Sequence, residues 1–146
     1  MDADPDMLRI AARKAVLAHA PVRFVCGFLQ DPVFRAESFN CVLSSLVFHH
    51  LDRASKLRAL SELYLVLEPG GRIHIVDWGR PAGAVLQFSF FLVRVLDGFR
   101  VTRDNARGEL PSLLIEAGFM SVEHRRRMNN FFGTLDFLSA AKNPEC

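Results

Sequence analysis

Residues able to do acid–base chemistry follow the ends of two apolar segments. His49 and His50 come shortly after the apolar run 41–46, and Asp77 lies near the end of the apolar run 73–78. Both runs lack polar alternation, which is typical of strands that are buried on both faces. Open α/β sheets bind ligands at the carboxyl ends of such strands. The sequence therefore predicts a site at this edge, with His50 and Asp77 as candidate general bases.

Each of these residues also has a purely structural interpretation. A histidine at the entry of a helix often bonds only to backbone, and Asp77 at a strand end is satisfied by neighbouring amides or by Arg80. No carboxylate or cysteine follows the two histidines at metal-ligand spacing, so no metal is expected. The run Arg125–Arg127 resembles a basic patch for nucleic acid, but a solvated strand explains it equally well.

Several enzyme classes are excluded by missing motifs. The sequence contains neither G-x-x-x-x-G-K-[ST], which binds phosphates, nor the G-x-S-x-G nucleophile elbow. The single tyrosine, Tyr64, is followed four residues later by Glu68 rather than by the lysine of short-chain dehydrogenases. None of the three cysteines lies in a recognisable nucleophile motif.

Helices and strands alternate along the chain and must position these residues. Asp4 and Asp52 each precede a segment with helical spacing of apolar residues, and Pro69-Gly70-Gly71 ends the second. The apolar spacing and the turn residues predict the following elements in chain order: helix 5–20, strand 22–26, strand 41–46, helix 52–68, strand 73–78, helix 82–96, helix 109–117, and a hairpin of 121–128 with 134–141. Alternating helices and strands predict one α/β domain with a mostly parallel sheet and one antiparallel hairpin.

Composition fits a globular chain without a dominant charge. The 146 residues are 50% hydrophobic and 23% charged, with a formal net charge of +2. This balance argues against a dedicated nucleic-acid binder. Three cysteines without paired spacing are typical of reduced thiols. The first six residues lack the apolar stretch of a signal peptide. We therefore expect a cytoplasmic protein, and we expect no membrane span.

An ordered series of motifs resembles one enzyme family over almost the whole chain. Residues 2–8 are similar to its D-x-D-x-x-M-L, and residues 38–42 to its S-F-D-x-V, and residues 65–72 to its R-V-L-K-P-G-G-R. Residues 110–119 and 132–135 are similar to its C-terminal part. These motifs resemble class I S-adenosylmethionine (SAM)-dependent methyltransferases, in particular those of ubiquinone and menaquinone biosynthesis. The resemblance covers the C-terminal two-thirds of the family's Rossmann-like fold.

The resemblance implies methyl transfer from SAM to a small, apolar acceptor. It implies cofactor-binding residues at Asp2, which matches the ribose-binding acid, and at Phe28, Leu29 and Ser45. It also places an acceptor wall at three aromatic residues, which are Trp78, Phe88 and Phe91. The alternative for Phe28 and the other phenylalanines is ordinary core packing.

The sequence departs from the family pattern in ways that favour a second interpretation. It contains no G-x-G-x-G, and Phe28 and Asn40 replace acids that the family often has. We therefore expect weak or no SAM binding by these 146 residues alone. The alternative is a catalytically silent methyltransferase-like module or a partner-binding subunit, and a nucleic-acid module comes third.

The missing first part of the family fold predicts an unusual sheet edge. In the family the strand order is 3-2-1-4-5-7-6, so strand 41–46 loses its neighbour and becomes an edge. An apolar edge invites pairing, so we expect either that 22–26 pairs directly with 41–46 or that a homodimer covers this edge. The contact is expected near four residues, which are Phe24, Phe39, Val42 and Leu43.

Overall fold

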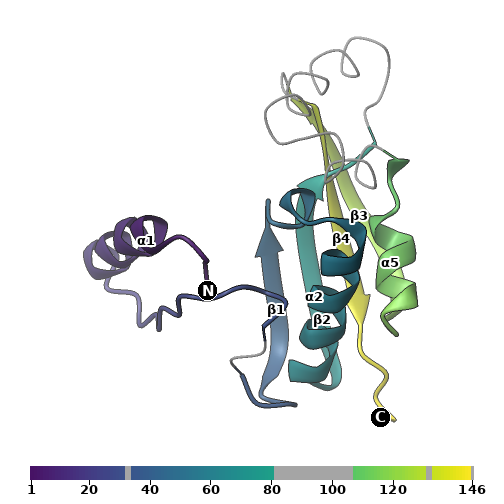
Figure 1. The fold of residues 1–146 in the computed structure, drawn as a ribbon, viewed down its shortest axis with the longest axis horizontal. Helices are drawn as coiled ribbons and strands as arrows, with labels where there is room; N and C mark the ends of the chain where they lie inside the picture. The colour runs from purple at the N-terminus through teal and green to yellow at the C-terminus, as the bar shows by residue number, and fades with distance from the viewer. Residues whose placement is uncertain (32–33, 81–106, 131–132, 146) are drawn as a thin grey trace.

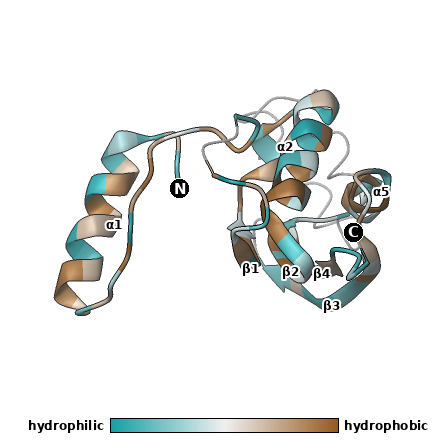
Figure 2. Cartoon of the chain, turned by 90° about the horizontal axis from the view of Figure 1, so that it is seen from below, coloured by the Kyte–Doolittle hydropathy of each residue, from teal (hydrophilic) through white to brown (hydrophobic). Residues whose placement is uncertain are grey.

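Helices on one face of a four-stranded sheet form the body of the protein (Figures 1 and 2). The structure is a computed structural model that describes residues 1–31, 34–80, 107–130 and 133–145. The elements are α1 (Pro5–Leu17), β1 (Phe39–Ser45), η1 (Phe48–His50), α2 (Arg53–Val66), β2 (Leu67–Trp78), α5 (Leu110–Glu116), β3 (Met120–Asn130) and β4 (Gly133–Ala141). The helix expected at 82–96 and the residues Phe88 and Phe91 lie outside the described residues.

The strand order of the sheet is β1-β2-β4-β3. β1 and β2 are parallel, whereas β2 with β4 and β4 with β3 are antiparallel. The described sheet is therefore mixed, with the expected parallel part represented by β1 and β2. The predicted hairpin and its pairing with the strand of Asp77 are both confirmed, because β4 lies between β3 and β2.

The apolar core lies between the sheet and the two helices α2 and α5. Every second residue of β2 and β4 faces it, as the pleat of a strand requires. Its fully or almost fully buried side chains are Phe48, Ala59, Leu60, Leu67, Ile73, Ile75, Leu113, Leu114, Phe119, Leu138 and Ala140. Asp52 caps α2 by accepting a hydrogen bond from the Ser55 amide at 2.9 Å, as its position in the sequence predicts.

β2 begins earlier than the sequence predicts. Residues 67–78 form one strand, and the Pro69-Gly70-Gly71 segment is a bulge within it rather than a loop before it. Opposite this bulge β1 advances by two residues, from Phe39 to Cys41, while β2 advances by five, from Leu67 to Arg72. Gly70 has φ +75°, a conformation that costs glycine nothing, so it suits this point. β2 therefore follows α2 with no loop between them, and it carries Asp77 one residue before its end.

The N-terminal segment stands apart from this body (Figures 1 and 2). Asp4 caps α1 as predicted, by accepting hydrogen bonds from the amides of Asp6 and Met7. No residue of α1 is buried. The strand expected at 22–26 is wrong as a regular element, because only Cys26 is paired, in an isolated parallel bridge with Asp2.

β1 is an edge strand in the described residues, as expected from the family strand order, whereas the burial on both faces that its apolar run indicated is wrong. Its side chains are mostly exposed, and that of Leu43 is 77% exposed. The expected pairing of 22–26 with 41–46 is also wrong, because β1 pairs with β2 and with no other described strand. Burial of a strand on both faces needs helices packed on both faces of the sheet, and that cover is a property of the fold rather than of the strand's own residues.

Candidate functional site

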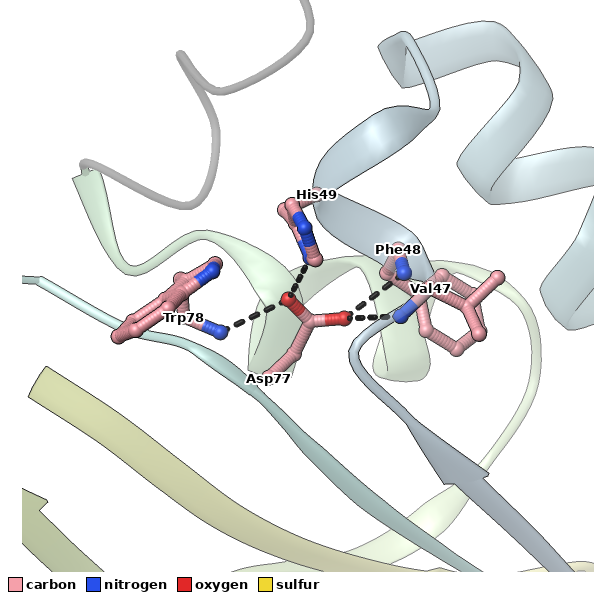
Figure 3. Close-up of polar contacts among 5 residues, drawn as sticks. All are labelled: Val47, Phe48, His49, Asp77 and Trp78. Carbon is pink, nitrogen blue, oxygen red and sulfur yellow. Dashed lines mark hydrogen bonds and ion pairs between the residues drawn. The ribbon is translucent and has the colours of Figure 1, made fainter. Parts of the chain in front are cut away.

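The side chain of Asp77 is the centre of a polar cluster at the carboxyl ends of β1 and β2 (Figure 3). It is only 1% exposed. Its Oδ2 accepts hydrogen bonds from the backbone amides of Val47 (3.1 Å) and Phe48 (2.7 Å). Its Oδ1 accepts from the amide of Trp78 at 2.7 Å and lies 2.8 Å from Nδ1 of His49. The carboxylate thus joins the end of β2 to the turn that follows β1.

These contacts explain why the chain folds tightly here. η1 begins right after β1 and presents unpaired amides at its N-terminus, as every helix start does. The Asp77 carboxylate satisfies two of these amides from the neighbouring strand. An acid buried without such donors would cost several kcal/mol, so the bonds make its burial possible. The interpretation of Asp77 as an acid that accepts hydrogen bonds from nearby amides is therefore confirmed.

His49, rather than His50, is the histidine that contacts Asp77. His49 is 4% exposed, whereas His50 is exposed and lies against it with the ring centroids 3.9 Å apart. A carboxylate that already accepts backbone hydrogen bonds acts toward the ring as an acceptor, so Nδ1 of His49 is the donor. That tautomer leaves the lone pair on Nε2. An imidazole oriented by a buried carboxylate is an arrangement for moving a proton.

The ring of Trp78 lies beside this pair. Its ring centroid is 6.4 Å from that of His49, in an edge-on arrangement. The assignment of Trp78 to the acceptor wall stays a prediction. Ser45 is the last residue of β1 and is exposed at the same end of the sheet.

Two of the four residues expected to bind the cofactor, Asp2 and Phe28, lie at or beside the N-terminal bridge. Asp2 and Cys26 pair in parallel, with hydrogen bonds from the Asp2 amide to Val25 (3.1 Å) and from the Gly27 amide to Asp2 (3.0 Å). This pairing brings Asp2 next to the turn at Phe28, whose side chain is 55% exposed. Leu29 packs instead against the core. Asp2, Phe28 and Asp77 thus come from separate parts of the chain.

A second buried acid was not identified from the sequence. Asp136 on β4 has a side chain that is 7% exposed and binds Arg127 of β3 through two hydrogen bonds. The register pairs it with Asp77 on one side and with Arg127 on the other. An acid inside an otherwise apolar strand was the available signal.

The comparisons with known proteins identify the family. The model of the family described as "Methyltransferase domain" matches residues 1–75. The chain therefore belongs to the methyltransferase domain family, and its fold is the Rossmann-like fold of the class I SAM-dependent methyltransferases.

Relatives and solved structures agree with this assignment. The chain is 36% identical over 97 residues to the demethylmenaquinone methyltransferase of Thermus thermophilus, covering 65% of this chain and 43% of that protein. It is 25% identical over 122 residues to the ubiquinone/menaquinone biosynthesis C-methyltransferase of Marinomonas sp., covering 71% and 48%. The chain thus spans about half the length of these curated relatives.

Two solved structures show the same fold. A SAM-dependent methyltransferase from Methanosarcina mazei aligns with a TM-score of 0.72 at 18% identity, covering 97% of this chain and 80% of that one. The phosphoethanolamine N-methyltransferase 2 of Haemonchus contortus, solved with phosphomonomethylethanolamine and S-adenosylhomocysteine, also aligns with a TM-score of 0.72, at 16% identity, covering 97% and 43%.

Proposed function

We propose that this chain takes part in SAM-dependent methyl transfer to a small acceptor with an apolar ring. The observation that carries the proposal is the His49–Asp77 pair at the carboxyl edge of the parallel strands, in a chain of the methyltransferase family. The quinone-type reactions named for its relatives support an apolar ring as the acceptor.

The described residues fit one part of the cofactor. The carboxylate of Asp2 is exposed beside the Phe28 turn, where it suits ribose hydroxyl groups, and the exposed Phe28 ring suits the face of an adenine. Ser45 supplies a hydroxyl at the sheet edge. When bound, SAM supplies an electrophilic methyl group. We assign these three residues to its binding, together with Leu29, which follows Phe28 in the chain and is partly buried against the core.

The chemistry left to the protein is alignment and proton removal. In this proposal Nε2 of His49 would accept the proton that the acceptor loses on methylation, while the methyl–sulfur bond would break and S-adenosylhomocysteine would leave. The buried carboxylate of Asp77 fixes the ring orientation and stabilises the imidazolium that results, so Asp77 is a positioning residue. Trp78 forms an apolar wall for the acceptor ring. His50 is the alternative base, and the experiment below separates the two histidines.

The test is methyl transfer from radiolabelled SAM to 1,4-naphthohydroquinone by the wild-type chain, His49→Gln and His50→Gln. Loss of a general base lowers a rate by about 10²–10⁴-fold. We expect a loss of that order for His49→Gln and a change of less than about threefold for His50→Gln. Equal losses, or the reverse order, would contradict the assignment of His49.

The silent-module alternative predicts a different outcome. It predicts no methyl transfer even at millimolar SAM, together with no thermal shift by SAM or S-adenosylhomocysteine. Its motive is the N-terminal helix α1, which buries no residue, together with the exposed strand β1. A shift without transfer would point to a binding module instead of an enzyme.

We also propose a homodimer that covers the edge of β1. The strand exposes Leu43 and Phe39, and α1 exposes Met7, Ile10, Val16 and Leu17. Edge strands with exposed apolar residues favour pairing with another chain. Light scattering of wild type and Leu43→Lys tests this, because a lysine on an edge strand opposes pairing. We expect a dimer for wild type and a monomer for the variant, and a monomeric wild type would overturn the proposal.

The compartment is part of the same proposal. No helix among the described residues has the length and apolarity needed to cross a bilayer. Cys26 and Cys41 are free and exposed. Exposed thiols without a partner suit a reducing compartment, and on this ground we place the protein in the cytoplasm.

A further inference from the structure

A row of charged side chains crosses three strands beside the His49–Asp77 pair. Asp77 on β2 stands opposite Asp136 on β4, and Asp136 stands opposite Arg127 on β3. Directly opposite residues of antiparallel strands project from the same face. That face is the one on which Ile73, Ile75 and Leu138 form the core. On this face of the sheet the apolar core is therefore followed, toward the carboxyl end of β2, by a row of charged side chains.

Two opposed carboxylates repel each other unless each has its own positive partner. Asp77 has backbone amides and His49, as described above. Asp136 has Arg127, whose Nε donates to Oδ1 at 2.6 Å and whose Nη2 donates to Oδ2 at 3.0 Å. These hydrogen bonds raise the pKa of Arg127 above its ordinary value, so the guanidinium stays charged wherever the protein is folded.

The chain makes room for this ion pair at Gly79. A Cβ atom at that position would overlap the carboxylate of Asp136. The Gly79 amide also donates to the carbonyl of Thr134 at 2.9 Å, which holds the backbone of the two strands together beside the acid. Thr134 is itself fully buried, and its hydroxyl donates to Asn129 at 2.9 Å. The Asp136 carboxylate therefore lies between Gly79 and Arg127, and its two bonds hold the Arg127 guanidinium in place.

Arg127 keeps donors that this pair does not use. A guanidinium has five N–H groups, of which two bind Asp136. Its Nη1 has no partner within the described residues, and the side chain is 48% exposed although the acid beneath it is buried. A guanidinium held flat by a buried acid offers its outer N–H groups to a carboxylate or phenolate in a defined geometry.

We propose that Arg127 binds an anionic oxygen on the ring of the methyl acceptor, and that Asp136 is the positioning residue for Arg127. The acceptor class is then an aromatic ring that bears a carboxylate or an ionised hydroxyl. The inference rests on the proposed function, because it takes the site at His49 to be the place where the methyl acceptor binds. Arg127 can reach an acceptor there, since His49 and Arg127 lie at the same end and on the same face of the sheet.

Binding of two matched probes tests this without the cofactor. Trp78 is the single tryptophan of the chain and lies 6.4 Å from His49 between ring centroids, so its fluorescence reports on the site. The probes are 1-hydroxy-2-naphthoate, which is an anion, and 1-naphthol, which is neutral at pH 7. We expect wild type to bind the anion at least about tenfold more tightly, because hydrogen bonds from a guanidinium to an anionic oxygen are stronger than those to a neutral hydroxyl.

The variants compare neighbouring arginines of the same strand. Arg127→Gln is expected to bind both probes equally, and Asp136→Asn is expected to lose most of the preference. Arg126→Gln is the matched control, because Arg126 pairs with Phe137 and thus faces the other side of the sheet. It should keep the full preference. Arg127→Lys keeps the charge but not the planar fork, so an intermediate preference is expected, and this variant serves if Arg127→Gln does not fold.

The outcomes separate this inference from the proposed function. A wild type that binds neither probe, or prefers neither, overturns the inference, and so does an Arg127→Gln variant that keeps the preference. Failure of methyl transfer with an intact anion preference would instead overturn the enzymatic proposal and leave the anion site. Equal weakening by Arg126→Gln and Arg127→Gln would show a general effect of charge and would overturn it as well.

Discussion

At the scale of single residues, the function of the site depends on which atoms Asp77 contacts. The sequence placed a histidine pair and an acid at neighbouring strand ends, and the structure brings them together. The sequence alone could not predict that His49 rather than His50 contacts Asp77. Adjacent residues in a one-turn helix point in different directions, so the choice depends on where the helix begins. That choice is made by η1, whose start is fixed by the acid itself.

Asp77→Asn tests how far this carboxylate supports the fold. The amide group of asparagine turns an acceptor into a donor, so at least one of the bonds to Val47, Phe48, Trp78 or His49 is lost in a buried place. Such a loss costs about 1–3 kcal/mol. Urea unfolding should show a decrease of this size in the free energy of unfolding. Asp6→Asn, at an exposed ion pair, is the control and should change stability by less than about 0.5 kcal/mol.

Gly79→Ala tests the contact between the strand end and Asp136. The added methyl group overlaps the carboxylate, so we expect a destabilisation of about 1–3 kcal/mol, as for other overpacked sites. If the carboxylate is the cause, the same change should cost much less in an Asp136→Ala background. A double-mutant cycle by denaturant unfolding measures this coupling. Additive costs would show that the glycine is needed for another reason.

At the scale of elements, local signals predicted what local contacts decide. The caps at Asp4 and Asp52 were correct because a capping side chain bonds to amides two or three residues away. The hairpin was correct because its strands are close in sequence. The burial of β1 was not correct, because it depends on helices that cover both faces of the sheet. The strand at 22–26 did not form as predicted, because a strand needs a partner strand that its own sequence does not describe.

The two helix caps give a matched prediction. Asp4 and Asp52 cap helices by the same kind of bond, but α1 buries no residue whereas α2 contributes Ala59, Leu60 and Leu63 to the core. Removing a cap costs about 1 kcal/mol. Asp52→Ala should therefore lower the midpoint of global unfolding. Asp4→Ala should lower helical circular dichroism with an unchanged midpoint, and a shared shift of both midpoints would show that α1 packs on the body.

At the scale of the whole molecule, the residues proposed for catalysis and those proposed for cofactor binding lie in two parts of the chain. The first part is closely packed, whereas the second is mostly exposed. Asp77, Asp136 and His49 belong to the packed body, and Asp2 and Phe28 belong to the N-terminal segment. The family resemblance could be predicted from ordered motifs over the chain. The Arg127–Asp136 pair could not, because its residues are nine positions apart and meet only through the register of a bulged hairpin.

The affinity of the 146 residues for SAM follows from this division. Few described contacts fix the Asp2 and Phe28 side relative to the body, and the sequence has no G-x-G-x-G. Ordering that segment on binding uses up part of the interaction energy. Calorimetry with SAM should therefore show a dissociation constant well above micromolar. A micromolar value, about −8 kcal/mol, would contradict this expectation.

The position of β4 in the sheet has a consequence for the synthesis of the protein. β4 separates β2 from β3, yet it is made after both of them. While the chain grows, β3 has no described strand to pair with and one edge of β2 stays open. Asp136 arrives with β4, so the charged row is completed only in that last step. A nascent chain that has reached Asn130 therefore has unpaired strand edges. In such a state aggregation competes with folding, and a chaperone can bind the exposed strands.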